Sequence, residues 1–146
     1  MIRCLKSSDH RDLYQILSNP AVMQYLEPPF NWEQTENFLQ NAGMCHPPLV
    51  YGLVWKESTK LIGHVIFHPF AECGYELGWV LHPDFWGMGI ATEVTEAVIT
   101  FAKNQGIACL YLECSPQQIA TIHIAKRFSF QYVDSPDGCF TFRLDL

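Results

Sequence analysis

The chain has 146 residues, of which 49% are apolar and 16% are charged; this is typical of one globular domain and argues against a disordered chain. Its formal net charge of −6 argues against a nucleic-acid partner, because phosphate binding needs clustered Lys and Arg. This charge suits either binding of a cationic ligand or simple solubility. No run approaches the roughly 18 apolar residues of a membrane span, and residues 1–6 do not read as a signal peptide, so we expect a cytoplasmic protein.

The N-terminal part begins with an apolar strand candidate at residues 2–5. Ser7-Ser8-Asp9 then supplies N-cap chemistry for a helix, and the apolar stripe of this helix consists of Leu13, Ile16 and Leu17. Asn19-Pro20 ends it, because proline does not continue a helix.

Two short helical segments follow. Residues 21–26 favour a single helical turn, which Pro28-Pro29 stops. Asn31 with Gln34 three residues later has the spacing of a capping box, and Gly43 is placed to close the helix that this box begins.

The middle of the chain predicts strands. Residues 49–56 and 61–67 are apolar, β-branched and aromatic runs, and the polar turn at 57–60 between them indicates a hairpin. A third run of this kind covers residues 75–81. Each has the length of an ordinary strand.

A long helix is predicted over residues 89–104, with Gly106 beyond its end. Its apolar positions at helical spacing are Ile90, Ala91, Val94, Ala97, Val98, Phe101 and Ala102. Residues 109–114 then read as a buried strand. A strand–helix–strand unit among antiparallel hairpins implies a mixed sheet.

The C-terminal part adds one helix and one hairpin. Ser115-Pro116-Gln117-Gln118 offers an N-cap, a proline at the first helical position and a capping glutamine, and we expect the helix to end near Arg127. Residues 130–133 and 139–144 flank the turn sequence Ser135-Pro136-Asp137-Gly138.

The six cysteines include no CxxC pair. In a cytoplasmic chain, such cysteines usually behave as small buried hydrophobes. We expect burial for Cys109 and Cys114, and neither a metal site nor structural disulfides.

The junction between the third strand and the long helix is the informative segment, because a loop containing Gly87 and Gly89 opens the helix. The first amides of a helix have no partner inside it, and its N-terminus carries partial positive charge. Glycines let the backbone approach a ligand closely, so such a loop can hold a diphosphate without lysine. Taken alone, however, a GxG sequence is more often a plain turn.

The context of this loop resembles the coenzyme A motif of the GCN5-related N-acetyltransferase (GNAT) superfamily, and in particular its RimJ/RimL-like branch. Residues 75–79 (YELGW) and 83–93 (PDFWGMGIATE) match that pattern almost position for position. Residues 12–26 resemble the N-terminal helices of the family, and 116–130 resemble its last helix, so most of the chain is covered. Met88 stands where the family often has Lys or Arg.

The resemblance implies a GNAT fold of α/β (α+β) class, with a mixed central β-sheet of about six to seven strands flanked by helices and a splayed central strand pair. It also implies that residues 1–146 form a single N-acetyltransferase domain, with acetyl-CoA as co-substrate and no metal. The implied cofactor-binding residues are Trp79, Val80, Leu81, Trp86, Gly87, Met88, Gly89, Ile90, Ala91, Thr92 and Gln118.

Acetyl transfer to an amine requires a base for the amine, a donor to the oxyanion and a proton for the leaving thiolate. By resemblance, Glu76 is the catalytic base, although it is equally open that Glu76 is a structural carboxylate that pairs across the sheet. Glu113 is the second candidate base, and Asp134 and Asp137 are weaker candidates. The backbone of Val80 or Leu81 is the implied oxyanion donor. In many members of the family a tyrosine of the last helix protonates the thiolate, but Ala125 stands at that position here. By resemblance, Thr121 could protonate the thiolate instead; the alternative is that it is an ordinary hydroxyl on the helix surface.

The predicted function is therefore transfer of an acetyl group from acetyl-CoA to a primary amine, of a small molecule or a peptide N-terminus, by direct attack in a ternary complex. The alternative is a catalytically weak or inactive acyl-CoA-binding module of the same fold. The expected partners are the amine acceptor alone, with no nucleic acid and no membrane. The acceptor's identity and the oligomeric state, including a homodimer, stay open.

Overall fold

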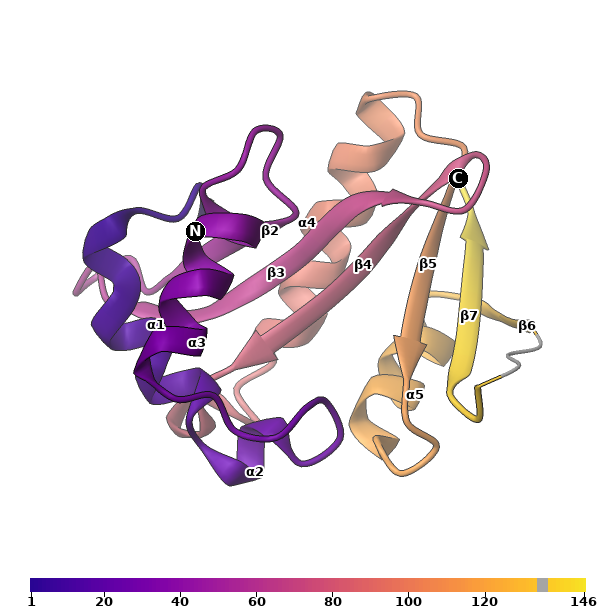
Figure 1. The fold of residues 1–146 in the computed structure, drawn as a ribbon. Coiled ribbons are helices and arrows are strands. Elements are labelled where there is room, and N and C mark those ends of the chain that lie inside the picture. Colours follow the sequence, from indigo (N-terminus) through magenta and orange to yellow (C-terminus); the bar gives the residue numbers. More distant parts are fainter. Residues whose placement is uncertain (134–136) are drawn as a thin grey trace. The chain divides into compact units, whose positions relative to one another are not determined.

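The computed structural model describes residues 1–133 and 137–146. Its seven-stranded sheet has the order β1-β2-β3-β4-β5-β7-β6 (Figure 1). The strands are β1 (Ile2–Arg3), β2 (Val50–Val54), β3 (Leu61–Phe70), β4 (Gly74–Leu81), β5 (Cys109–Cys114), β6 (Gln131–Val133) and β7 (Phe140–Asp145). The α-helices are α1 (His10–Leu17), α2 (Pro20–Met23), α3 (Trp32–Phe38), α4 (Ile90–Asn104) and α5 (Ile119–Arg127). The predicted mixed α/β class and strand number are confirmed.

The pairing within the sheet is mixed, as expected. β4 and β5 run parallel, whereas the β1–β2, β2–β3, β5–β7 and β6–β7 pairs are antiparallel. The parallel ladder joins only residues 74–76 to residues 109–111, although β4 runs on to Leu81 and β5 to Cys114. Such an early end of the ladder accords with the splayed strand pair that the resemblance implies.

The chain divides into two compact units, each of which is described by itself. Unit 1 comprises residues 1–66 and 79–88, and unit 2 comprises residues 67–78 and 89–146. The expectation that residues 1–146 form one domain stays a prediction.

The core of unit 1 lies between α1 and the sheet. The predicted α1 stripe is confirmed, because Leu13 and Ile16 are fully buried and Leu17 is only 2% exposed. These side chains pack in one cluster with apolar residues of β2 and β3, among them Val50, Val54 and Leu61. Each buried leucine of this kind stabilises the fold by about 2 kcal/mol.

The predicted capping box begins α3. The Asn31 side chain accepts a hydrogen bond from the Gln34 N–H (2.8 Å), and the Gln34 side chain accepts one from the Asn31 N–H (2.9 Å). The helix continues through a π-helical turn, Leu39–Gly43. A Cβ at Gly43 would lie 2.5 Å from the Cδ1 atom of Leu5, so close packing favours glycine at this end.

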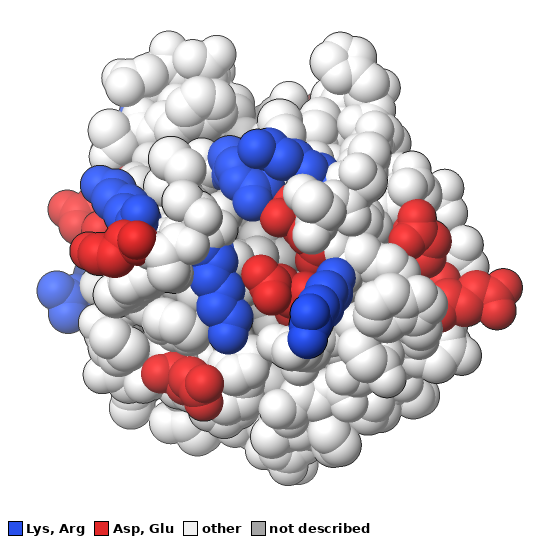
Figure 2. Space-filling model, turned by 90° about the vertical axis from the view of Figure 1, so that its left-hand side faces the viewer, with Lys and Arg blue, Asp and Glu red and all other residues white. Residues whose placement is uncertain are grey.

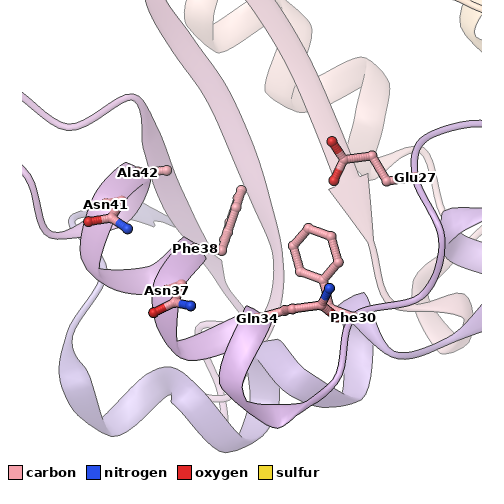
Figure 3. Close-up of a pocket in the computed structure, with 7 residues that line it drawn as sticks. All are labelled: Glu27, Phe30, Gln34, Asn37, Phe38, Asn41 and Ala42. Atoms are coloured by element: carbon pink, nitrogen blue, oxygen red, sulfur yellow. The ribbon is translucent and has the colours of Figure 1, made fainter.

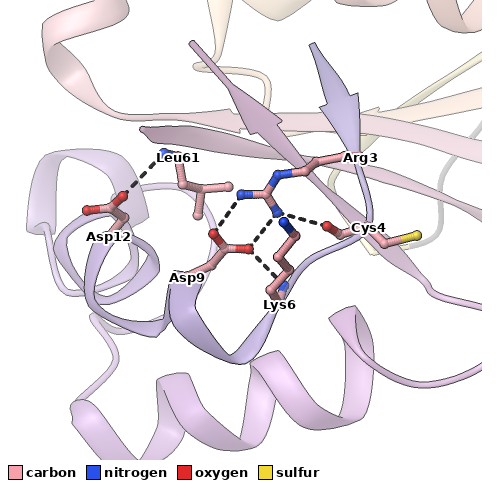
Figure 4. Close-up of polar contacts among 6 residues, drawn as sticks. All are labelled: Arg3, Cys4, Lys6, Asp9, Asp12 and Leu61. Atoms are coloured by element: carbon pink, nitrogen blue, oxygen red, sulfur yellow. Dashed lines mark hydrogen bonds and ion pairs between the residues drawn. The ribbon is translucent and has the colours of Figure 1, made fainter. Parts of the chain in front are cut away.

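Two carboxylates tie the start of unit 1 together (Figure 4). Asp9 accepts hydrogen bonds from both terminal nitrogens of Arg3 (2.7 and 2.8 Å) and from the Lys6 N–H (2.8 Å). Asp12 accepts one from the Leu61 N–H of β3 (3.2 Å). The prediction that Ser7-Ser8-Asp9 caps α1 is therefore wrong in detail. A 3-10 turn, Ser7–Asp9, precedes α1, and the Asp9 carboxylate binds Arg3 and the Lys6 N–H instead of the first amides of the helix.

In unit 2, α4 follows the predicted apolar stripe only in part. Val94, Val98 and Ala102 are buried, but Ala97 is exposed and Phe101 is 52% exposed, with its ring against Phe67. The buried neighbour that the pattern did not indicate is Thr95, whose hydroxyl donates to the Ala91 carbonyl (2.7 Å) and so needs no solvent.

The C-terminal elements match the expected order with one shift. α5 begins at Ile119 with Gln118 as its N-cap residue, three positions after the expected cap at Ser115, although the Gln118 side chain does accept a hydrogen bond from the Ser115 N–H (2.8 Å). Cys109 and Cys114 are buried, as predicted. The predicted hairpin strands pair as β6 and β7; part of the expected turn between them, with Asp134, lies outside the described residues.

The surface drawn in Figure 2 carries Lys and Arg side chains interspersed with Asp and Glu, without one extended basic patch on that face. None of the helices in the described part of the chain combines the length and the apolar composition that a membrane crossing requires.

Candidate functional site

The loop between β4 and α4 has the backbone that its two glycines predict. Gly87 and Gly89 have φ values of +72° and +79°, in the left-handed region. A Cβ at either position would meet no atom within 4 Å, so the backbone angle, and not crowding within the chain, makes glycine the favoured residue. The two positions leave open space beside the backbone at the start of α4.

The start of α4 offers backbone donors. Gly89 is the N-cap residue and has no side chain to satisfy the amides of the first turn. The first intrahelical hydrogen bond runs from the Glu93 N–H to the Gly89 carbonyl (3.0 Å), so helix geometry provides no partner for the N–H groups of Ile90, Ala91 and Thr92. These groups, at the positive end of a 15-residue helix, can bind an anion such as a diphosphate.

The Trp86 side chain fixes the loop against the end of β4. Its indole N–H donates to the Leu81 carbonyl (2.9 Å). Trp86 and Met88 remain 49% and 56% exposed, so much of both side chains is open to solvent in this loop. Met88 brings no charge to this loop.

The end of β4 has a defined orientation. The His82 N–H donates to the Ile62 carbonyl of β3 (2.8 Å). Because hydrogen-bonding groups alternate from side to side along an antiparallel strand, the backbone groups of Val80 face β3 whereas those of Leu81 and Trp79 face away from it. Of the two expected oxyanion donors, only the Leu81 N–H therefore has the orientation needed to reach a ligand.

Glu76 of β4 forms an ion pair with His68 of β3, with His68 Nε2 3.1 Å from Glu76 Oε2. Both side chains are about three-quarters buried. Burial raises the pKa of the Glu76 carboxyl; His68 acts in the opposite direction, and the carboxylate of Glu113 adds to the rise. A carboxyl whose pKa moves towards neutrality is suited to accept a proton, although this contact is also the cross-strand pair of the structural alternative.

The second candidate carboxylate, Glu113 of β5, is exposed and accepts a hydrogen bond from the Thr141 hydroxyl of β7 (3.2 Å). It lies directly opposite Thr141 in the β5–β7 pair. Asp137 is exposed as well. The partial burial that favours Glu76 as a base is absent at both of these positions.

The three positions singled out near α5 lie in different surroundings. Thr121 is half-buried on the helix, Ala125 is fully buried, and Gln118 precedes the first turn with its side-chain oxygen already bonded to the Ser115 N–H. The Ala125 position therefore faces the core of unit 2, whereas Thr121 keeps part of its surface exposed.

The sequence analysis missed His68. It assigned this histidine no role, and the signal that could have identified it is the register of the β3–β4 hairpin, which brings His68 next to Glu76. No group of three His, Cys, Asp or Glu side chains within residues 1–133 and 137–146 is arranged to hold a metal ion.

Comparison with known proteins agrees with this architecture. The acetyltransferase (GNAT) domain family matches residues 1–131. The uncharacterized N-acetyltransferase YnaD of Bacillus subtilis is 26% identical over 134 residues, which cover 90% of this chain and 78% of that protein.

Solved structures share the fold at lower identity. A GNAT-family acetyltransferase from Bacillus anthracis superimposes with a TM-score of 0.87 at 23% identity, covering 99% of this chain and 93% of that one. The ribosomal L7/L12 alpha-N-protein acetyltransferase RimL, solved in complex with coenzyme A, superimposes with a TM-score of 0.82 at 20% identity, again covering 99% of this chain and 93% of that one.

Proposed function

Because the chain belongs to the acetyltransferase (GNAT) domain family, we propose that it uses acetyl-coenzyme A to acetylate a primary amine, of a small molecule or a protein N-terminus. Its class as an acyltransferase enzyme follows from the family and from relatives named as N-acetyltransferases.

The observation that carries this proposal is the Gly87–Gly89 loop at the start of α4. Its left-handed glycines and unsatisfied first-turn amides suit a diphosphate, which acetyl-coenzyme A contains. The coenzyme A complex of RimL, a protein of the same fold, supports the same ligand class. Trp79 and Leu81, whose backbone groups face away from β3, would hydrogen-bond the pantetheine arm as an added strand does.

Three groups then share the acid–base chemistry. Glu76 takes a proton from the acceptor ammonium, directly or through water, and the free amine attacks the thioester carbonyl. The Leu81 N–H donates to the oxyanion that develops on this carbonyl. As the carbon–sulfur bond breaks, the attacking nitrogen loses its second proton, the Thr121 hydroxyl relays a proton to the leaving thiolate and regains one from that nitrogen through water, and the acetyl group stays on the nitrogen as an amide.

The test has two arms. Titration calorimetry with acetyl-coenzyme A measures binding, and release of free thiol in the presence of an amine panel measures transfer. We expect binding and amine-dependent thiol release. Binding without turnover across the panel would favour the inactive binding module, and absence of binding would contradict the role of the loop.

A further inference from the structure

A cavity of about 430 Å³ opens on the surface of unit 1, beside α3 (Figure 3). It is lined by Glu27, Phe30, Gln34, Asn37, Phe38, Asn41 and Ala42. This volume lies within the range of ordinary small-ligand sites. The sequence analysis had given none of these residues a part in ligand binding, and Gln34 entered it only as a member of the predicted capping box.

Two aromatic rings form the apolar wall of this cavity. Phe30 and Phe38 meet edge to face, with ring centroids 6.0 Å apart and an interplanar angle of 64°. Both are partly buried against the core of unit 1, which fixes their positions. In Figure 3 both side chains and the Glu27 carboxylate project towards the same space.

The charge in the lining of the cavity is negative. Glu27 is the only charged side chain among the lining residues, and the rest of the polar lining consists of the amides of Gln34, Asn37 and Asn41. None of the lining residues in the described part of the chain is Lys or Arg, so none of them would neutralise an anion. A carboxylate beside aromatic rings instead favours a cation, which gains from the ion pair and from the ring faces together.

Phe38 lies against His64 of β3, with ring centroids 5.3 Å apart, and Phe30 and Phe38 both pack against the core cluster that includes Val80, the neighbour of the proposed oxyanion donor Leu81. Resting on the proposed amine acetylation, we infer that this cavity, which belongs to the same unit as Leu81, binds a second positive charge of the acceptor. The preferred substrates are then amines that carry another cationic group, such as diamines or peptides with a nearby Lys or Arg side chain. Glu27 pairs with that cationic group, while the aliphatic chain of the substrate lies along Phe30 and Phe38. The net charge of −6 favours approach of the same substrates.

A matched pair of acceptors tests this inference. Pentylamine and 1,5-diaminopentane have the same carbon chain and differ only in the second ammonium group. We expect kcat/KM to be about tenfold higher for the diamine, the combined effect of one exposed ion pair and one cation–π contact. In Glu27→Gln, kcat/KM for the diamine should fall to the value for pentylamine in the same variant, so that the preference disappears.

The control is Glu57→Gln, which removes an equally exposed carboxylate in the β2–β3 turn of the same unit, away from the cavity. It should keep the preference of the wild-type chain. Equal kcat/KM for the two amines in the wild-type chain, or a preference that survives Glu27→Gln, would overturn the inference and leave the proposed function intact.

If neither amine gives thiol release, neither of them is an acceptor, and the cavity is judged by binding alone. Calorimetric titration of 1,5-diaminopentane then decides: weaker binding to Glu27→Gln than to the wild-type chain supports the cation site. Equal binding, or no binding to either protein, contradicts it.

Discussion

His68 and Glu76 face each other from β3 and β4, with the imidazole Nε2 3.1 Å from the carboxylate Oε2. Two opposing effects act on the Glu76 carboxyl: burial raises its pKa, and His68 lowers it. In a general base this balance matters, since the carboxyl must be ionised at the working pH and still bind a proton in the reaction.

Replacing the proposed base should reduce the rate and spare the cofactor. Glu76→Gln keeps the size of the side chain but cannot accept the proton, so we expect kcat to fall by about 100-fold or more. The affinity for acetyl-coenzyme A, measured by calorimetry, should stay as in the wild-type chain. Glu113→Gln is the control: a comparable loss there would indicate that Glu113, and not Glu76, is the base.

Removing the histidine should shift the pH dependence. Because His68 lowers the pKa of Glu76, His68→Gln should raise that pKa further. The base is active only when ionised, so the acidic limb of the kcat/KM profile should move to higher pH. His123→Gln, which alters an exposed histidine of α5, should leave the limb in place. A limb that does not respond to His68→Gln would mean that another group controls it.

The glycine loop can be tested against a glycine at the other end of the same helix. Gly87, Gly89 and Gly106 all have φ values between +71° and +79°, and none has an atom within 4 Å of an added Cβ. Asp at each position should therefore cost a similar free energy of unfolding, about 1 kcal/mol. Only Gly87→Asp and Gly89→Asp should abolish acetyl-coenzyme A binding, because they add charge where the diphosphate is proposed to lie.

The Gly106→Asp variant supplies the reference for this comparison, with stability measured by urea unfolding and affinity by calorimetry. Unchanged affinity in folded Gly87→Asp and Gly89→Asp proteins would remove the loop from the cofactor site.

His64 should make the stability pH-dependent. Its ring is 3% exposed, its Nδ1 has no hydrogen-bond partner among the described residues, and burial lowers its pKa from 6.5 to about 4. Between these values the unfolded chain binds the proton and the folded chain does not. The free energy of unfolding should therefore be greatest above pH 6.5 and decrease as the pH is lowered towards 4, by up to about 1.4 kcal/mol per pH unit.

His64→Leu removes the group that takes up this proton and places an apolar side chain beside Phe38. Urea unfolding at several pH values between 4 and 7.5 should show a smaller decrease for the variant than for the wild-type chain. Identical slopes would show that His64 ionises normally in the folded protein.

Much of the fold could be predicted from local signals. The capping box at Asn31, the α1 stripe and the β5 run were identified correctly because each depends on residues close together in the chain. The α4 stripe was identified less well. Helical spacing cannot tell which side of the helix is covered, so exposed Phe101 and buried Thr95 were both unexpected.

The candidate site divides in the same way. The Gly87–Gly89 loop is contiguous, and its left-handed backbone is a local property of glycine, so the sequence alone determined both its position and its conformation. The orientation of the Leu81 N–H, the contact of His68 with Glu76 and the cavity beside Phe38 required the tertiary structure. Each depends on which residues of separate elements come to face one another, and strand register and helix packing decide that only when the chain folds.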